Sequence, residues 1–285
     1  MKDVKQAIIL DLDETLEHGT MEFAENKTLY IMTLRPQIEK LAKRLKEIRK
    51  EDLADVILCT DASREWVEVF LKKCPEMKGV FNKIYSKTNR KEWEEYDEEK
   101  YEIEYILDRK EGKQKPVTTF GYDRFLFIDD NIAAGRRLKE IANRRKENMK
   151  DISYYSGGGF FIDLKSHLHF KNAAKGDKEI ANEYEKLLDI SLEEPGVEYM
   201  IEVINTFLKK GFKEGFNNYD ENYDKIYHEY KKRYIRTKDR VMGMVLRRDN
   251  ERGKSSYYTK DEMIEYFIKN ADLSMRDKED IDEIE

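Results

Sequence analysis

Cysteine is scarce in this sequence of 285 residues, which contains only Cys59 and Cys74. Two cysteines cannot build the disulfide framework on which many small secreted domains depend. Cys59 lies within an apolar run, where a buried thiol is expected, and buried thiols suit a reducing compartment. The sequence therefore predicts an intracellular, cytoplasmic protein.

Long hydrophobic runs are also lacking. A membrane-spanning helix needs about 20 consecutive apolar residues, and no run approaches that length. Only a few apolar residues precede Asp11, and no small-residue cleavage site follows them, unlike in a secretory signal. We therefore expect a soluble protein with no membrane partner.

Charge of one sign is not concentrated in long blocks. Charged residues make up 40% of the chain, but acidic and basic residues are mixed, and the net charge is −6. Hydrophobic residues make up 39%, enough for a sizeable core. The composition predicts a folded protein with charged helix surfaces, and its acidic balance argues against nucleic acid as a partner.

Short apolar runs alternate with helical patterns in the first half of the chain. The runs cover residues 7–12, 56–59 and 125–128, and helical spacing of apolar residues lies between them. This alternation is typical of an α/β fold, a Rossmann-like doubly wound parallel sheet. Between Leu16 and Val56 we expect a loop and one helix, which leaves little room for a large cap over the sheet.

The remaining chain divides into an insertion and a helical region. Residues 86–114 are rich in charged residues and tyrosine and indicate a small polar insertion. We place a core domain at 1–175 and an α-helical region, with no strands, at 176–285. His167 and His169 alternate with Leu168 as in a strand, and they lack the partners of a metal site.

Polar side chains follow each of the three apolar runs. In an open α/β sheet, ligands bind at the carboxyl ends of the strands. Neighbouring carboxylates there can supply a nucleophile, a proton carrier and oxygen ligands for magnesium, while a hydroxyl and an ammonium can hold phosphate. The residues in these positions are Asp11, Asp13 and Thr15, then Thr60, then Asp129 and Asp130, with Lys115 ahead of the third run.

Each of these residues also has an ordinary structural interpretation. Thr60 could satisfy backbone groups at a strand end, and Lys115 could be a surface lysine. Asp129 and Asp130 could cap a helix that begins near Ala133. These separate interpretations do not explain why all three buried runs end in polar groups, and their ordered occurrence is the stronger signal.

The order Asp-x-Asp-x-Thr, Thr, Lys, Asp-Asp is similar to the four motifs of haloacid dehalogenase-like phosphatases. DLDETL at residues 11–16, LRP at 34–36, TDAS at 60–63 with Trp66 downstream, and Lys115 fourteen residues before Asp129 resemble the subgroup of RNA polymerase II C-terminal-domain phosphatases. The matching motifs run from about Ile8 to Asn131.

This resemblance implies a magnesium-dependent phosphatase that forms an aspartyl-phosphate on Asp11. Asp13 would carry the proton, Thr60 and Lys115 would bind the phosphoryl group, and Asp61 would stand beside it. The metal ligands would be Asp11, the backbone carbonyl of Asp13, Asp129 and Asp130. Asp61, Gln37 and Pro116 depart from residues common in the subgroup; none removes a catalytic group, but all bear on specificity.

The substrate and the helical region leave alternatives open. A sparsely capped site could admit a phosphorylated protein, or the enzyme could hydrolyse a small metabolite, a nucleotide or a nucleic-acid end. The third alternative is a weakly catalytic scaffold that uses its C-terminal helices as an interface. Residues 231–254 hold ten basic and three acidic side chains, which we interpret as a solvated helix surface in preference to a docking surface.

Overall fold

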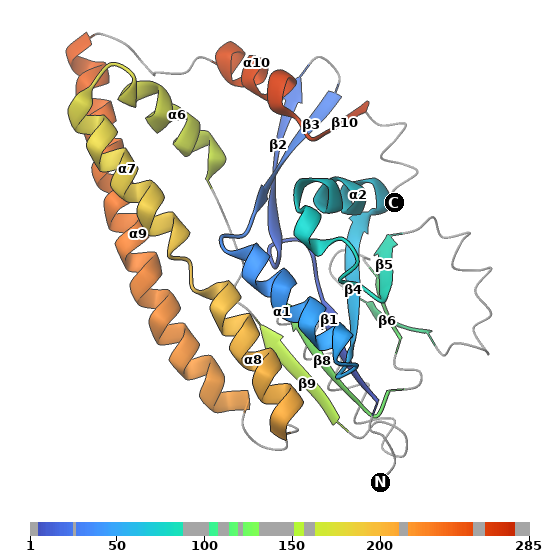
Figure 1. Ribbon diagram of the computed structural model, residues 1–285. Coiled ribbons are helices and arrows are strands. Elements are labelled where there is room, and N and C mark those ends of the chain that lie inside the picture. The colour runs from blue at the N-terminus through green and yellow to red at the C-terminus, as the bar shows by residue number, and fades with distance from the viewer. Residues whose placement is uncertain are drawn as a thin grey trace.

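The protein is described by a computed structural model. The structure describes residues 5–24, 27–87, 103–107, 114–118, 122–130, 151–156, 163–210, 216–252 and 260–276. Among these residues, a five-stranded parallel sheet has the order β5-β4-β1-β8-β9 (Figure 1). Its strands are β1 (Gln6–Leu10), β4 (Asp55–Ser63), β5 (Lys83–Lys87), β8 (Arg124–Asp129) and β9 (Asp151–Ser156).

The central strands are buried on both faces. Successive residues of β1 from Ala7 to Leu10 are at most 1% exposed, as are Ile57 and Leu58 in β4. Continuous burial of this kind is expected for a parallel sheet with both faces covered. The predicted α/β class and its three central strands are thereby confirmed, whereas β5 and β9 at the sheet edges were not predicted.

Three helices lie against one face of this sheet. They are α1 (Ile38–Lys50), α2 (Arg64–Lys73) and α8 (Gly196–Lys210), with a short 3-10 turn, η1 (Pro75–Met77), after α2. α1 buries five apolar residues at helical spacing, Ile38, Leu41, Ala42, Leu45 and Ile48, and each fully buried leucine or isoleucine contributes about 1.5–3 kcal/mol. α8 packs on α1 and shares this core through Met200, Val203 and Phe207. The domain division at residue 175 remains a prediction.

A second, three-stranded sheet corrects two expectations from the sequence. β2 (Glu17–Ala24) and β3 (Lys27–Leu34) form an antiparallel hairpin where a loop was predicted, and β10 (Leu273–Arg276) pairs with β3 in a region where no strand was predicted. Helix α10 (Lys260–Asn270) covers one face of this sheet (Figure 1). β10 has only four residues, too few for a period-2 pattern to show, and it is stabilised by pairing with distant β3.

Three further helices, α6 (Leu164–Ala174), α7 (Lys178–Leu192) and α9 (Phe216–Arg252), pack together. His167 and His169 lie in α6, so the strand predicted for them was wrong. Three alternating residues fit either structure, and here Asp163 caps a helix by accepting a hydrogen bond from the Ser166 amide at 3.0 Å.

Basic residues of α9 pair with acidic residues of the neighbouring helical segments. Lys238 Nζ lies 2.6 Å from Asp163 Oδ2, and Arg248 Nε lies 2.8 Å from Asp177 Oδ2. These contacts favour the helix-surface interpretation of residues 231–254. Within the described part of the chain, no helix is both long and apolar enough to cross a membrane.

Part of the predicted insertion forms a small antiparallel hairpin of β6 (Ile103–Leu107) and β7 (Gln114–Thr118). β7 lies beside β4. The other residues of the insertion between 88 and 102 and between 108 and 113 lie outside the described residues.

Candidate active site

Three neighbouring parallel strands, β1, β4 and β8, are aligned in register, and this alignment creates the site. Leu10 of β1 is aligned with Leu58 of β4 and with Ile128 of β8. The next residue along β1, Asp11, donates its backbone N–H to the Ile128 carbonyl at 2.9 Å. The polar residues that follow the three strands therefore meet at one edge of the sheet, as expected for an open α/β fold.

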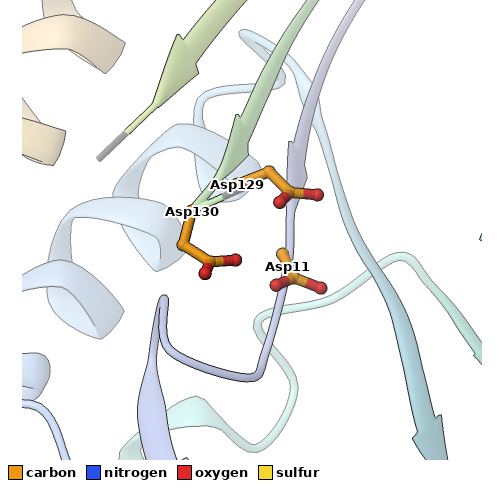
Figure 2. Close-up of side chains that lie close together, drawn as sticks. All are labelled: Asp11, Asp129 and Asp130. Atoms are coloured by element: carbon orange, nitrogen blue, oxygen red, sulfur yellow. The ribbon is translucent and has the colours of Figure 1, made fainter. Parts of the chain in front are cut away.

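Three carboxylates converge at this edge. Asp11, Asp129 and Asp130 each offer a carboxylate oxygen, and these oxygens lie within 4.8 Å of one another. Figure 2 shows the three side chains directed into the same space from the ends of β1 and β8. Asp11 is 1% exposed and Asp129 is fully buried.

The arrangement fits a magnesium ion. Magnesium binds oxygen ligands at about 2.0–2.1 Å in octahedral geometry, which places ligand oxygens about 3–4 Å apart. The spacing of the three carboxylate oxygens is compatible with that geometry. A divalent cation would also relieve the mutual repulsion of these acidic groups.

The loop between β1 and β2 is a tight turn that places Asp13 beside Thr60. Glu14 adopts a left-handed conformation with φ of 58°, and the Leu16 amide donates to the Leu12 carbonyl at 2.8 Å. The Thr60 hydroxyl donates to Asp13 Oδ2 at 3.2 Å and accepts from the Ala62 amide at 3.0 Å. Thr60 is thus fixed in orientation in the carboxyl-terminal half of β4.

The structure gives less detail for the two remaining predicted site residues, Asp61 and Lys115. Asp61 follows Thr60 in β4 and is partly exposed. Lys115 lies in β7, which runs beside β4, but its side chain lies outside the described part of the structure. The structure thus brings Asp11, Asp129 and Asp130 together and joins Asp13 to Thr60. The roles of all seven residues remain predictions.

A buried acid next to Asp13 was not predicted. Glu17 is fully buried at the start of β2, and its Oε1 accepts a hydrogen bond from the Trp66 indole at 2.9 Å. Burial, together with the hydrogen bond and negative charge of Asp13, raises the pKa of Glu17 well above its usual range. The raised pKa favours the neutral form of Glu17 beside Asp13. In the sequence, the only sign of this buried acid is that Glu17 directly follows the apolar residue Leu16.

Glutamine at position 17 is expected to change how stability depends on pH. Folded Glu17 keeps its proton while the unfolded residue ionises near 4.5. Its stabilising contribution is therefore complete below that pH and is lost as pH rises towards the raised folded pKa. Relative to Glu17→Gln, the wild type should lose up to about 1.4 kcal/mol per pH unit over this window.

Urea unfolding of both proteins between pH 5 and pH 9 measures this difference. Glu17→Leu is the control. Its side chain is similar in size to that of glutamate, but it can neither titrate nor form a hydrogen bond. Parallel stability curves for wild type and Glu17→Gln would show that Glu17 is ionised in the folded protein.

The fold and the site together define a class of protein. A parallel sheet that carries an Asp-x-Asp loop after its central strand, a hydroxyl after the next strand and an acidic pair after the third has the core of a haloacid dehalogenase-like phosphatase. This is the arrangement that the resemblance in the sequence implied.

Part of the chain also matches a known family model. Residues 6–142, just under half of the chain, match the NLI interacting factor-like phosphatases, a family of haloacid dehalogenase-like C-terminal-domain phosphatases. This match indicates a phosphatase enzyme. Among curated proteins, none matches the sequence.

Proposed function

We propose that the protein is a magnesium-dependent phosphomonoester hydrolase that works through an aspartyl-phosphate on Asp11 and acts on phosphorylated protein. The observation that carries this proposal is the convergence of Asp11 with Asp129 and Asp130, next to the Asp13–Thr60 contact. Asp11 and Asp13 lie on the same short loop, which supports attack by the first carboxylate and proton transfer by the second.

The proposed reaction has two displacements at phosphorus. In the first, an Asp11 carboxylate oxygen forms a bond to phosphorus while the bond to the leaving oxygen breaks, and Asp13 donates a proton to that oxygen. In the second, Asp13 takes a proton from water, whose oxygen attacks phosphorus. The bond to Asp11 breaks and orthophosphate leaves, which restores both carboxyl groups.

Asp11, Asp129, Asp130 and the backbone carbonyl of Asp13 would hold the magnesium ion. When bound, this ion supplies positive charge that offsets the charge of the phosphoryl oxygens. Thr60 would donate to a phosphoryl oxygen, with Asp61 beside it, and Lys115 would add a second positive charge. The buried Glu17, which accepts a hydrogen bond from the Trp66 indole, lies beside Asp13 in the backbone pairing.

An exposed apolar surface beside the site supports a polypeptide substrate. Met21 and Phe23 of β2 are 53% and 62% exposed. They lie on the sheet face that continues from Gly19, where an added Cβ would lie 3.3 Å from the Trp66 ring. The cross-strand partner of Met21 is Tyr30, which packs edge-on against Trp66.

This surface starts within a few residues of the catalytic loop and leads away from it. β2 begins at Glu17 and forms the edge of its sheet. An extended peptide with apolar side chains near its phosphorylated residue can use such a surface, whereas a nucleotide or a sugar phosphate has little apolar area to bury.

A substrate panel tests the proposal. Phosphoserine, phosphothreonine and phosphotyrosine peptides are compared with nucleotides, sugar phosphates and p-nitrophenyl phosphate, each with magnesium and with EDTA. We expect hydrolysis only with magnesium and a higher kcat/KM for phosphopeptides. Preference for nucleotides would favour the small-molecule alternative, and no turnover on any substrate would favour the scaffold alternative.

The double variant Met21→Ser/Phe23→Ser tests whether the apolar surface causes the preference for phosphopeptides. We expect its KM for an apolar phosphopeptide to rise about 5- to 50-fold, because two apolar contacts are lost. Its kcat and KM for p-nitrophenyl phosphate should remain at wild-type values, since that substrate is too small to reach Met21 or Phe23. The control is Leu188→Ser/Leu192→Ser, which removes exposed apolar residues of α7. An unchanged peptide KM in the β2 variant would contradict this role.

A further inference from the structure

A buried ion pair joins the helical half of the protein to the phosphatase core. Arg35 follows β3 and is 1% exposed, and Glu194 lies between α7 and α8 and is 2% exposed. Arg35 Nε donates to Glu194 Oε2 at 3.0 Å, and Nη2 donates to Oε1 at 2.8 Å. These two parallel hydrogen bonds form the bidentate arrangement that fixes the plane of a guanidinium group.

The third edge of the same guanidinium reaches the catalytic loop. Arg35 Nη1 donates to the Thr15 carbonyl at 2.8 Å, and the Arg35 amide donates to the Leu16 carbonyl at 3.0 Å. The Thr15 hydroxyl in turn lies 3.5 Å from Asp11 Oδ2 and is directed towards it as a donor. A continuous series of polar contacts therefore runs from Glu194 through Arg35 and Thr15 to Asp11.

The first residue of α8 leaves no space for this guanidinium to move. A Cβ added at Gly196 would lie 2.1 Å from Arg35 Nη2 and 2.4 Å from its Cζ. Arg35 is at the same time among the largest fully buried side chains of the described structure. Any side chain at position 196 must therefore displace a group that has little free volume around it.

We propose that Glu194 and Arg35 are positioning residues of the phosphatase site, so that the junction between α7 and α8 completes the scaffold of the Asp11 loop. Glu194 lies outside the residues that match the phosphatase family. The inference rests on the proposed function of Asp11 as nucleophile. Neither residue touches the substrate: Glu194 orients Arg35, and Arg35 holds the backbone that carries Asp11 and Thr15.

A purely structural ion pair would stabilise the fold without affecting catalysis by the folded enzyme. The exposed pair of Lys40 and Glu198 provides the matched comparison. Its Nζ and Oε1 atoms lie 3.0 Å apart with both side chains more than half exposed, and it joins α1 and α8, the helices that begin shortly after Arg35 and Glu194. Surface pairs of this kind contribute little to stability.

Three variants disturb the buried series of contacts in different ways. Gly196→Ala displaces the guanidinium and changes no charge. Glu194→Gln removes one charge and keeps the shape. The double variant Arg35→Met/Glu194→Met removes both partners together, because the loss of one alone leaves a buried charge uncompensated, whereas replacement of a whole buried pair by apolar residues is often tolerated. Glu198→Gln is the control.

The measurement is kcat for magnesium-dependent hydrolysis of p-nitrophenyl phosphate, at a temperature well below every Tm, together with the inhibition constant of orthophosphate. We expect kcat to fall about 10- to 100-fold in the three variants, because a small displacement of the nucleophile is costly. The inhibition constant of orthophosphate should stay within about twofold, because the phosphate contacts of Thr60 and Lys115 are untouched. Glu198→Gln should retain the wild-type kcat.

Hydrogen exchange provides a readout that is independent of turnover. Amides of residues 11–17 should exchange faster in the three variants than in wild type or Glu198→Gln, because the loop loses its anchor. Wild-type kcat and unchanged exchange in the double variant would overturn the positioning role while leaving the proposed function intact. A wild-type protein with no phosphatase turnover would instead overturn the proposed function itself.

Discussion

Substitution of Asp11 by asparagine is expected to abolish magnesium-dependent hydrolysis of p-nitrophenyl phosphate, with kcat reduced at least about 10³-fold. Asparagine has the shape of aspartate and can still accept the hydrogen bond that the Thr15 hydroxyl directs at this side chain. The fold should therefore survive. The amide cannot attack phosphorus and is a poorer ligand than a carboxylate for magnesium, so the nucleophile and one metal ligand are lost together.

The matched control is Asp123→Asn. Asp123 accepts a hydrogen bond from the Lys5 amide at 3.0 Å, just before β1 and therefore at the end of the sheet opposite to the site. It should keep the wild-type rate. Intact-protein mass spectrometry after a rapid acid quench gives the second readout, because the wild type should carry a phosphoryl group that Asp11→Asn lacks. A phosphorylated, active Asp11→Asn protein would rule out Asp11 as the nucleophile.

Substitution of Asp13 by asparagine should affect the two displacements at phosphorus differently. p-Nitrophenolate is a good leaving group that needs little protonation, so phosphorylation of Asp11 should still proceed. Hydrolysis of the phosphoenzyme needs a base, and its rate should fall about 10²- to 10⁴-fold. We therefore expect a burst of one nitrophenolate per enzyme molecule followed by slow turnover.

The leaving group provides the control for Asp13→Asn. An alkyl phosphate, such as a phosphoserine peptide, has a leaving oxygen that must be protonated, so its first displacement should slow and the phosphoenzyme should not accumulate. If Asp13→Asn slows both substrates equally and shows no burst with the aryl ester, Asp13 acts only through structure. Asp13 could act structurally by holding Thr60, because the Thr60 hydroxyl donates to Asp13 Oδ2 at 3.2 Å. Unchanged inhibition by orthophosphate would argue against such a structural role.

The sequence predicted the three central strands and the convergence of Asp11, Asp129 and Asp130, because both depend on local patterns. Each central strand is a short apolar run whose end is marked by a change to polar residues, and the parallel alignment of Leu10, Leu58 and Ile128 then places those ends together. Asp11, Thr60 and Asp129 could be expected to meet without any knowledge of distances. The family match over residues 6–142 agrees with this part of the chain.

The missed features depend on contacts between residues far apart in the chain. The β2–β3 hairpin is held by pairing with β10 and by α10, more than two hundred residues later. Arg35 could be recognised as part of the LRP sequence, but its partner Glu194 is one of many acidic residues, and no spacing distinguishes it. The raised pKa of Glu17 results from burial, which a single sequence does not reveal.

The pairing of β10 with β3 has a consequence for synthesis on the ribosome. The nascent chain emerges from its N-terminus, so Asp11 and Asp13 leave the exit tunnel early, whereas residues 273–276 leave late. Until then, the edge of β3 that β10 will occupy has no partner from this strand and can pair with another chain. Ribosome-bound chains that stop before residue 273 should therefore aggregate through this edge more readily than chains that include β10.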